Sequence, residues 1–194
     1  MIDWKELFSD LPPPWLVMVC GLVGVGKTTI AHQISQNLNA AYLSTDQTGY
    51  RLFGAERRYD EAYYQSVYDH MMQEVSRVLR SGGSVVLDGT FLKTKTRERF
   101  FEAFQQSASL WTVYVTCSEE IVKKRLEHRL HEPLAQRGYS DARWEVYQAM
   151  KEKLAQNLEY TVPTGERVSL ITIDTTAQPW RIVEKRVVLP WKLL

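Results

Sequence analysis

The feature that most constrains this chain is the segment at residues 21–29, which reads Gly-Leu-Val-Gly-Val-Gly-Lys-Thr-Thr and contains a complete G-x-x-x-x-G-K-T pattern. The glycines of such a loop let the backbone turn closely around an oxyanion, with N–H groups pointing inward at the start of a helix. In this pattern the lysine reaches the β- and γ-phosphates of a nucleotide, and the following hydroxyl ligates magnesium. We therefore expect nucleotide binding by Gly21, Leu22, Val23, Gly24, Val25, Gly26, Lys27, Thr28 and Thr29.

The residues on either side of this loop support the same interpretation. Residues 15–20 are a short apolar run rich in valine, as in a strand buried on both faces. Beyond the loop, Ile30, Ile34 and Leu38 recur every four residues and form one apolar helical face. A strand, a glycine loop and a helix in succession are the context that a phosphate-binding loop requires, and a chance match in a glycine-rich turn would lack it.

The rest of the chain alternates between short apolar runs and helical periodicity. We expect further strands at 41–44, 84–88, 110–116 and 168–174, and helices at 60–80, 93–106, 121–130, from 140 onward and at 179–187. Five strands alternating with helices predict an α/β fold with a parallel sheet, helices on both faces and right-handed crossovers. The specific expectation is a P-loop NTPase three-layer sandwich with a five-stranded parallel sheet.

Length and composition indicate one P-loop domain at residues 15–194, preceded by an N-terminal arm at 1–14 that contains Pro12, Pro13 and Pro14. Hydrophobic residues make up 44% of the chain and charged residues 24%, as in globular proteins. No apolar run approaches the length of a membrane span, and the first residues do not resemble a signal peptide, so we expect a cytoplasmic protein without a membrane partner. The net charge of +1 gives no general attraction to nucleic acid, although a local basic groove stays open.

The cysteines and histidines do not predict a metal or disulfide site. Cys20 and Cys117 fall in or beside expected core strands, where a thiol behaves as a small hydrophobe. The histidines show no metal-ligand spacing, and none is assigned a role; they are His32, His70, His128 and His131.

Two aspartates end predicted strands, where ligands of parallel sheets bind. Asp46 follows the strand at 41–44, where its carboxylate would accept the proton of an attacking hydroxyl or hold magnesium through water; the alternative is that it only caps the following turn. Asp88 ends an apolar strand and precedes Gly89 and Thr90, as a Walker B acid does, and we expect it to orient magnesium together with Thr28. Capping of the next helix is the alternative for Asp88 as well.

Basic side chains gather at residues 123–143. Arg125 and Arg129 stand one helical turn apart, and Pro133 and Gly138 supply possible hinges. Arginines that close over a transferring phosphate stabilise its charge without accepting a proton, so we expect a helical lid at about 123–143. The alternative is a solvated helix face. The cluster contains Lys123, Lys124, Arg125, Arg129, Arg137 and Arg143.

Aromatic residues crowd the region after Asp46. Stacking against an acceptor base or sugar and packing in the core are both open for them, with core packing favoured for Tyr64. They are Tyr50, Phe53, Tyr59, Tyr63 and Tyr64.

Several motifs together resemble a known family. Residues 14–29, Leu43-Ser-Thr-Asp46 with Leu52-Phe-Gly54, and Val85-Val-Leu-Asp-Gly-Thr-Phe91 look like the P-loop kinases often labelled AAA family ATPases, which are similar to polynucleotide kinases and zeta toxins. Arg125 with Arg129, Tyr139-Ser-Asp-Ala142 and Ile173-Asp-Thr175 fit the same pattern. The resemblance spans residues 14–176 and implies a nucleoside-kinase-like fold.

The resemblance implies ATP as phosphoryl donor, Mg2+, and a hydroxyl acceptor near Asp46. It also implies that Arg125 lies on the adenine, that Arg129 contacts the transferring phosphate, and that the loop after Asp174 borders the base. Many relatives carry an acceptor-gripping arginine three residues after the strand-two aspartate, but this chain has Gly49 there, with Arg51 two residues later. The identity of the acceptor therefore does not follow from the resemblance.

These residues predict an ATP-dependent kinase that transfers the γ-phosphate of MgATP to a hydroxyl group. Lys27 and Arg129 would stabilise charge, Thr28 and Asp88 would hold magnesium, and Asp46 would position or deprotonate the acceptor. The acceptor class stays open among small molecules, sugar-nucleotides and polynucleotide ends. The alternative function is an ATP-binding regulatory module that hydrolyses ATP slowly and has no small acceptor.

Overall fold

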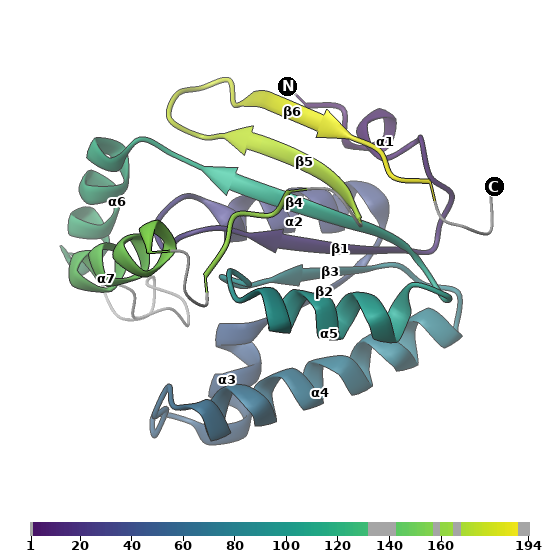
Figure 1. Cartoon of the computed structure of the whole chain (residues 1–194), viewed down its shortest axis with the longest axis horizontal. Coiled ribbons are helices and arrows are strands. Elements are labelled where there is room, and N and C mark those ends of the chain that lie inside the picture. The colour runs from purple at the N-terminus through teal and green to yellow at the C-terminus, as the bar shows by residue number, and fades with distance from the viewer. Residues whose placement is uncertain (1, 132–142, 157–159, 165–167, 190–194) are drawn as a thin grey trace.

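The computed structural model describes residues 2–131, 143–156, 160–164 and 168–189. Its helices and strands alternate along most of the chain (Figure 1). In chain order they are α1 (Trp4–Leu7), β1 (Trp15–Cys20), α2 (Lys27–Leu38), β2 (Ala41–Ser44), α3 (Thr45–Phe53), α4 (Glu61–Arg80), β3 (Val85–Asp88), α5 (Thr94–Phe104), β4 (Ser109–Thr116), α6 (Glu119–His131), α7 (Trp144–Ala155), β5 (Ser169–Asp174) and β6 (Arg181–Arg186).

Within the described residues the strands form one six-stranded sheet in the order β2-β3-β1-β4-β5-β6. The pairs β2–β3, β3–β1, β1–β4 and β4–β5 are parallel, so the five predicted parallel strands are confirmed. The carboxyl ends of these strands meet at one edge of the sheet, beside α6 and α7 (Figure 1). This is the edge at which α/β sheets of this kind bind ligands.

The sixth strand corrects one prediction. The sequence predicts a closing helix at residues 179–187 with Pro179 in its first turn, but β6 instead pairs antiparallel with β5. The β-branched Ile182 and Val183 are compatible with an extended chain, and pairing with β5, which the local sequence does not reveal, stabilises the strand over the predicted helix. Every residue of β6 is exposed, and its charged side chains suit an outer edge strand.

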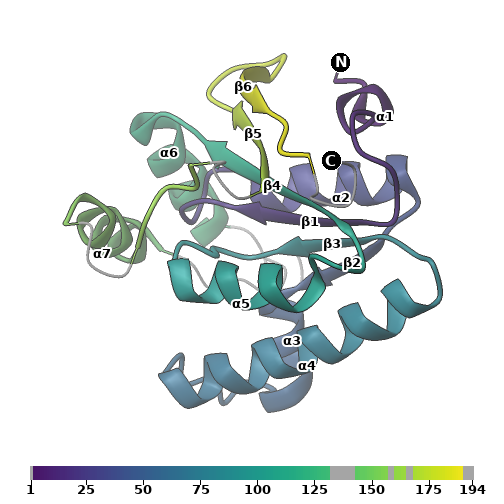
Figure 2. The ribbon, with the colours of Figure 1, turned by 45° about the vertical axis from the view of Figure 1, so that its right-hand side comes forward.

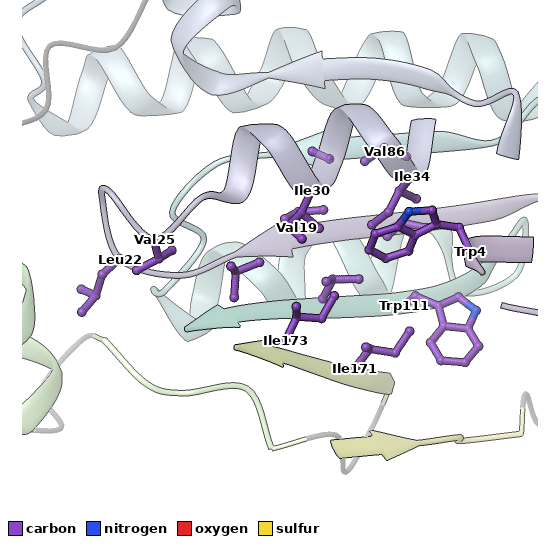
Figure 3. Close-up of a cluster of buried hydrophobic side chains, with 14 of the residues drawn as sticks. Trp4, Val19, Leu22, Val25, Ile30, Ile34, Val86, Trp111, Ile171 and Ile173 are labelled. Carbon is purple, nitrogen blue, oxygen red and sulfur yellow. The ribbon is translucent and has the colours of Figure 1, made fainter. Parts of the chain in front are cut away.

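Two apolar layers cover the two faces of the sheet, which confirms the three-layer arrangement. On one face α1 and α2 pack on β1, β4 and β5 through residues such as Ile30, Ile34 and Trp111 (Figure 3). On the other face α4 and α5 pack on β1 and β3, with Met71 and Phe100 fully buried. Burial on both faces explains why β1 and β3 are continuous apolar runs.

The N-terminal arm is packed against the first of these layers. Trp4, Phe8 and Leu11 are buried, and the Phe8 ring meets the Trp111 ring edge-on with centroids 5.1 Å apart. The indole nitrogen of Trp4 donates a hydrogen bond to Oε1 of Gln33 in α2 at 3.3 Å. The arm therefore adds to the core on the α2 side of the sheet.

The remaining helices differ in detail from the prediction. Helix α3 is not among the predicted elements; Ser44 is its N-cap, and its side chain accepts a hydrogen bond from the backbone N–H of Gln47 at 3.5 Å. Much of the predicted lid lies outside the described residues. This part contains Pro133, Gly138 and the expected start of the next helix at residue 140. Among the residues that are described, no helix is long and apolar enough to cross a membrane.

Candidate active site

The glycine loop joins β1 to α2 at the carboxyl edge of the sheet. Gly26 is the N-cap of α2 with φ at +99°, a conformation that side chains rarely adopt, and it offers no side chain to cap the helix. The first backbone N–H groups of α2 therefore have no side-chain cap at Gly26, and N–H groups of this kind can bind an anion. A Cβ at Gly24 would lie 2.9 Å from Cγ1 of Val122 and 3.0 Å from Cγ of Leu126, so α6 packs directly on the loop.

Lys27 is half-buried beside this loop. Its ammonium group donates a hydrogen bond to the carbonyl of Leu22 at 2.8 Å. Burial lowers the pKa of Lys27, the carboxylates of Asp88 and Asp46 oppose this effect, and Arg129 reinforces it. These influences identify the charges that surround the lysine: two carboxylates and one guanidinium.

Asp88 is held at the end of β3 by two hydroxyl groups. Thr28 Oγ1 donates to its Oδ2 at 2.8 Å, and the Tyr42 hydroxyl donates to the same oxygen at 2.7 Å. The ring of His32 is stacked on the Tyr42 ring, with centroids 4.1 Å apart. Burial and the negative charge of Asp88 raise the pKa of Tyr42, so its hydroxyl stays a donor to the carboxylate. The predicted pair Thr28 and Asp88 is thus in direct contact.

A cavity of about 660 Å³ opens at this edge of the sheet. It brings together the side chains predicted to carry the chemistry, namely Lys27, Thr28, Asp46, Asp88 and Arg129. Val23, Gly24, Gly26 and Thr29 of the loop also line it, whereas Gly21, Leu22 and Val25 lie in the same loop but outside its lining.

Asp46 reaches this cavity from the first turn of α3. Ser44 is the N-cap of that helix, so Asp46 stands inside the first turn rather than at the cap position. A carboxylate in the first turn is favoured by the helix dipole, which stabilises its negative charge. Asp46 therefore lies on the wall of the cavity that β2 and α3 build.

The two arginines of α6 take different places. The guanidinium of Arg125 donates to Oγ1 and to the carbonyl oxygen of Thr175, at 3.0 and 2.7 Å. The Thr175 hydroxyl in turn donates to the carbonyl of Val25 in the glycine loop at 2.6 Å. Arg125 thus ties α6 to the loop and to the segment after β5, while Arg129 and Arg143 line the cavity. Arg137 of the predicted cluster lies outside the described residues.

The aromatic residues after Asp46 divide into two groups. Tyr59 and Tyr64 line the cavity, whereas Tyr63 is buried and contacts both of their rings. Tyr50 and Phe53, 48% and 37% exposed, are not among the lining residues. Tyr64 thus packs partly against the core, as predicted, and also lines the cavity.

Several cavity residues were missed by the sequence analysis. Tyr42 and His32 carry no motif, although alternation along β2 and the turn spacing of α2 would place both near the loop. Tyr68 stands one helical turn after Tyr64, a spacing that could have suggested it. The lining also contains Gln47, Val146 and Met150.

The environment of Gly49 explains the absence of an arginine there. A Cβ at this position would run into the hydroxyl of Tyr63 and would lie 2.8 Å from Cζ of the same ring. The Tyr63 side chain thus occupies the space that a larger residue would need. Arg51 is exposed and is not among the described lining residues, so it does not take over that place.

Comparisons with known proteins agree with this fold. A shikimate kinase from Dechloromonas aromatica is 24% identical over 162 residues, which cover 78% of this chain and 82% of that protein. The crystal structure of Chaetomium thermophilum Kti12 in complex with ADP-AlF3 has a TM-score of 0.63 at 20% identity and covers 82% of this chain and 89% of that one. For a gluconokinase from Sinorhizobium meliloti the TM-score is 0.59 at 18% identity, covering 86% and 85%.

A family model described as an AAA domain matches residues 16–156, which run from β1 to the end of α7. The matched range contains the glycine loop, Asp46, Asp88 and both arginines of α6. The narrower kinase group suggested by the sequence motifs stays a prediction. The fold is an α/β P-loop kinase fold, and the chain belongs to the AAA domain family.

Proposed function

We propose that this protein is an ATP-dependent kinase that transfers the γ-phosphate of MgATP to a hydroxyl group of an acceptor. The observation that carries the proposal is the meeting of Lys27, Thr28, Asp88, Asp46 and Arg129 in one cavity. A relative named as a shikimate kinase and a similar structure named as a gluconokinase support the same reaction class.

The donor half of the reaction is assigned to the glycine loop and its neighbours. The backbone N–H groups at the start of α2 would bind the phosphates, and Lys27 would neutralise the charge that spreads over the γ-phosphate. The ammonium group of Lys27 donates a hydrogen bond to the Leu22 carbonyl. When ATP binds, it would exchange this carbonyl for a phosphate oxygen. Arg125, which donates a hydrogen bond to Thr175 in the segment after Asp174, would lie on the adenine, and that segment would border the base.

The residues fit a magnesium ion. Thr28 and Asp88 offer a hydroxyl and a carboxylate whose oxygens lie 2.8 Å apart, and oxygen donors of this kind suit Mg2+. A magnesium ion held by Thr28 and Asp88 would neutralise part of the negative charge of the phosphates. The Tyr42 hydroxyl would keep the Asp88 carboxylate oriented toward the loop.

The acceptor half is assigned to Asp46. Its carboxylate would accept a hydrogen bond from the attacking hydroxyl and take its proton as the new oxygen–phosphorus bond forms, while the bond between the γ-phosphorus and the β,γ-bridging oxygen breaks and ADP leaves. Arg129, which lines the same cavity, would stabilise the transferring phosphate from the side of α6. No protein–phosphate intermediate is needed, since positioning and charge stabilisation account for phosphoryl transfer.

The test measures MgATP binding and acceptor-dependent ADP formation for the wild type and for Lys27→Ala. The variant should lose about 100-fold or more in phosphoryl transfer, as expected when a preorganised charge at the transition state is removed. Lys5→Ala, at an exposed site in α1, is the matched control and should leave the rate unchanged.

Two results would contradict the proposal. One is transfer by Lys27→Ala at the wild-type rate. The other is tight MgATP binding by the wild type with no turnover across a broad panel of alcohols, which would favour the regulatory module. Labelling of 5′-hydroxyl DNA or RNA from γ-labelled ATP decides whether a polynucleotide end is the acceptor.

A further inference from the structure

The acceptor side of the cavity carries little charge. Residues 41–68 are all described, and of those that line the cavity Asp46 alone is charged. Arg51 is exposed outside this lining, and Arg57 lies with its guanidinium 5.6 Å from the centre of the Tyr59 ring. Since Tyr63 fills the space beside Gly49, the wall built by residues 41–68 presents no cation of its own to an acidic acceptor.

The same wall is rich in aromatic surface. Tyr59, Tyr64 and Tyr68, which we call the tyrosine row, all line the cavity. The rings of Tyr64 and Tyr68 are stacked with centroids 5.9 Å apart, and those of Tyr59 and Tyr64 are 6.4 Å apart. The row therefore offers a continuous aromatic surface in the cavity that Asp46 also lines, suited to stacking with a ring.

The row is held in place from several sides. Tyr68 packs on Phe91 and Phe100, with centroids 6.0 and 6.2 Å away. Tyr59 has φ at +55°, a left-handed conformation that costs a non-glycine residue free energy, and yet its ring stays 37% exposed. A strained backbone that keeps an aromatic side chain at a cavity wall is a feature of binding sites rather than of cores.

Helix α7 adds apolar surface to the same cavity. Val146 and Met150 line it one helical turn apart, and Val146 is 40% exposed. Figure 2 shows α7 beyond the carboxyl edge of the sheet, on the side where α4 begins. Arg143, the residue before α7, lines the cavity as well. Among the described residues, the acceptor half thus combines tyrosine rings, aliphatic side chains, the Asp46 carboxylate and, at the α7 end, the Arg143 guanidinium.

We propose that the acceptor is an uncharged alcohol whose hydroxyl group is attached to a ring, and that this ring stacks on the tyrosine row while the hydroxyl meets Asp46. This inference rests on the proposed kinase function and names its substrate class. Nucleosides and monosaccharides share the required chemistry, a ring whose face can stack on an aromatic side chain and a hydroxyl group in the same molecule. Acceptors that carry a carboxylate or a phosphate near the reacting hydroxyl are disfavoured, because they would lie beside the Asp46 carboxylate on a wall in which residues 41–68 present no cation.

The experiment uses the chain of residues 1–194 and γ-labelled ATP, and it compares the phosphorylation of different acceptors. Adenosine and uridine represent nucleosides, glucose and galactose represent monosaccharides, shikimate and gluconate are acidic alcohols, and glycerol is a neutral alcohol without a ring. At least one ring alcohol without charge should be phosphorylated with a higher kcat/KM than the acidic alcohols and glycerol. Comparison of kcat/KM for the nucleosides with kcat/KM for the monosaccharides shows which of these two classes is the acceptor.

Variants of the tyrosine row test the stacking directly. Tyr64→Leu should raise KM for the ring acceptor about 10- to 100-fold, the range expected for loss of one stacking contact, and Tyr64→Phe should restore it. Tyr50→Leu is the matched control, because Tyr50 does not line the cavity. MgATP binding should be the same in all of these variants, since the proposal assigns the phosphates to the glycine loop and the tyrosine row carries no charge. If Tyr64→Leu fails to fold, Tyr59→Leu takes its place.

Each other result overturns the inference. Preferred turnover of shikimate, gluconate or glycerol, or an unchanged KM in Tyr64→Leu with normal MgATP binding, would refute the ring acceptor and leave the kinase function intact. Absence of MgATP binding by the wild type would refute the kinase function, and the acceptor assignment would fall with it.

Discussion

Replacement of Gly49 by alanine tests the packing that shapes the acceptor side of the cavity. Gly49 lies inside α3, where alanine is normally favoured over glycine by about 1 kcal/mol. Here, however, the new Cβ would collide with the Tyr63 hydroxyl and lie 2.8 Å from Cζ. Tyr63 is buried, and its ring contacts those of Phe53 and Tyr64 with centroids 5.1 and 5.2 Å away, so it cannot turn aside cheaply.

The magnitude follows from two opposing effects. Overpacking of a well-filled site costs about 1–3 kcal/mol, and the gain in helix propensity offsets about 1 kcal/mol of it. Gly49→Ala should therefore destabilise the fold by up to about 2 kcal/mol, measured by urea unfolding followed by circular dichroism. In a Tyr63→Phe background, which removes the nearest atom, the same substitution should cost less by about 1 kcal/mol or more.

Two results would refute this reasoning. Stabilisation by Gly49→Ala in the wild-type background would mean that the glycine is an ordinary helix position without steric constraint. Equal costs of Gly49→Ala in the wild-type and Tyr63→Phe backgrounds would mean that the Tyr63 hydroxyl does not fill the space beside Gly49. Either result would also remove the explanation for the missing arginine.

Three further predictions concern the support of the site. Arg97→Met should lower the unfolding free energy by about 2–3 kcal/mol, because the buried guanidinium bonds the Phe91 carbonyl and the Thr161 carbonyl and hydroxyl; thermal unfolding measures this loss. Tyr42→Phe removes one of the two hydroxyl donors to the Asp88 carboxylate and should raise the Mg2+ concentration needed for half-maximal activity about tenfold, for a loss of about 1–2 kcal/mol. Burial raises the pKa of Cys20 to about 12, so its neutral thiol should resist iodoacetamide at pH 8 until the protein unfolds, as mass spectrometry would show.

Controls separate these effects from general damage. Arg77→Met removes an exposed ion pair with Glu74 on α4 and should leave the midpoint of thermal unfolding close to that of the wild type. A similar loss of unfolding free energy in Arg97→Met and Arg77→Met would show that the buried hydrogen bonds of Arg97 stabilise the fold no more than an exposed ion pair does. For Cys20, the raised pKa favours the neutral thiol in the folded state, so its contribution to stability is present below the ordinary value of 9.0 and is lost as pH rises toward about 12. Rapid labelling of Cys20 in the folded protein at pH 8 would contradict its burial.

The donor half of the site was predictable because short-range patterns determine it. The glycine loop, the apolar strand before Asp88 and the helix after Lys27 are each encoded by neighbouring residues, and parallel pairing then brings them to one edge of the sheet. The contact between Thr28 and Asp88 follows from that register, although the residues are 60 positions apart. Prediction of these elements does not depend on how the rest of the protein packs around them.

The acceptor half was less predictable because tertiary contacts determine it. Helix α3 is short and contains Gly49, so its sequence has weak helical character until Ser44 caps it and Tyr63 packs against it. The role of Tyr42 depends on the pairing of β2 with β3, which places its hydroxyl on Asp88. Within residues 179–187, pairing with β5 stabilises a strand where the sequence predicts a helix. Local propensity is a weak guide where a distant segment supplies the partner.

The most direct test of the central claim uses Asp46→Asn, because this variant separates nucleotide binding from transfer. Asp46 lines the cavity from α3 rather than from the glycine loop, and its amide isostere keeps the shape while it removes the base. The account predicts MgATP affinity within about threefold of the wild type and a loss of transfer to the acceptor of at least about 100-fold, with Asp69→Asn on α4 as the unaffected control. Transfer by Asp46→Asn at the wild-type rate would contradict the claim that this cavity joins a bound nucleotide to a hydroxyl activated by Asp46.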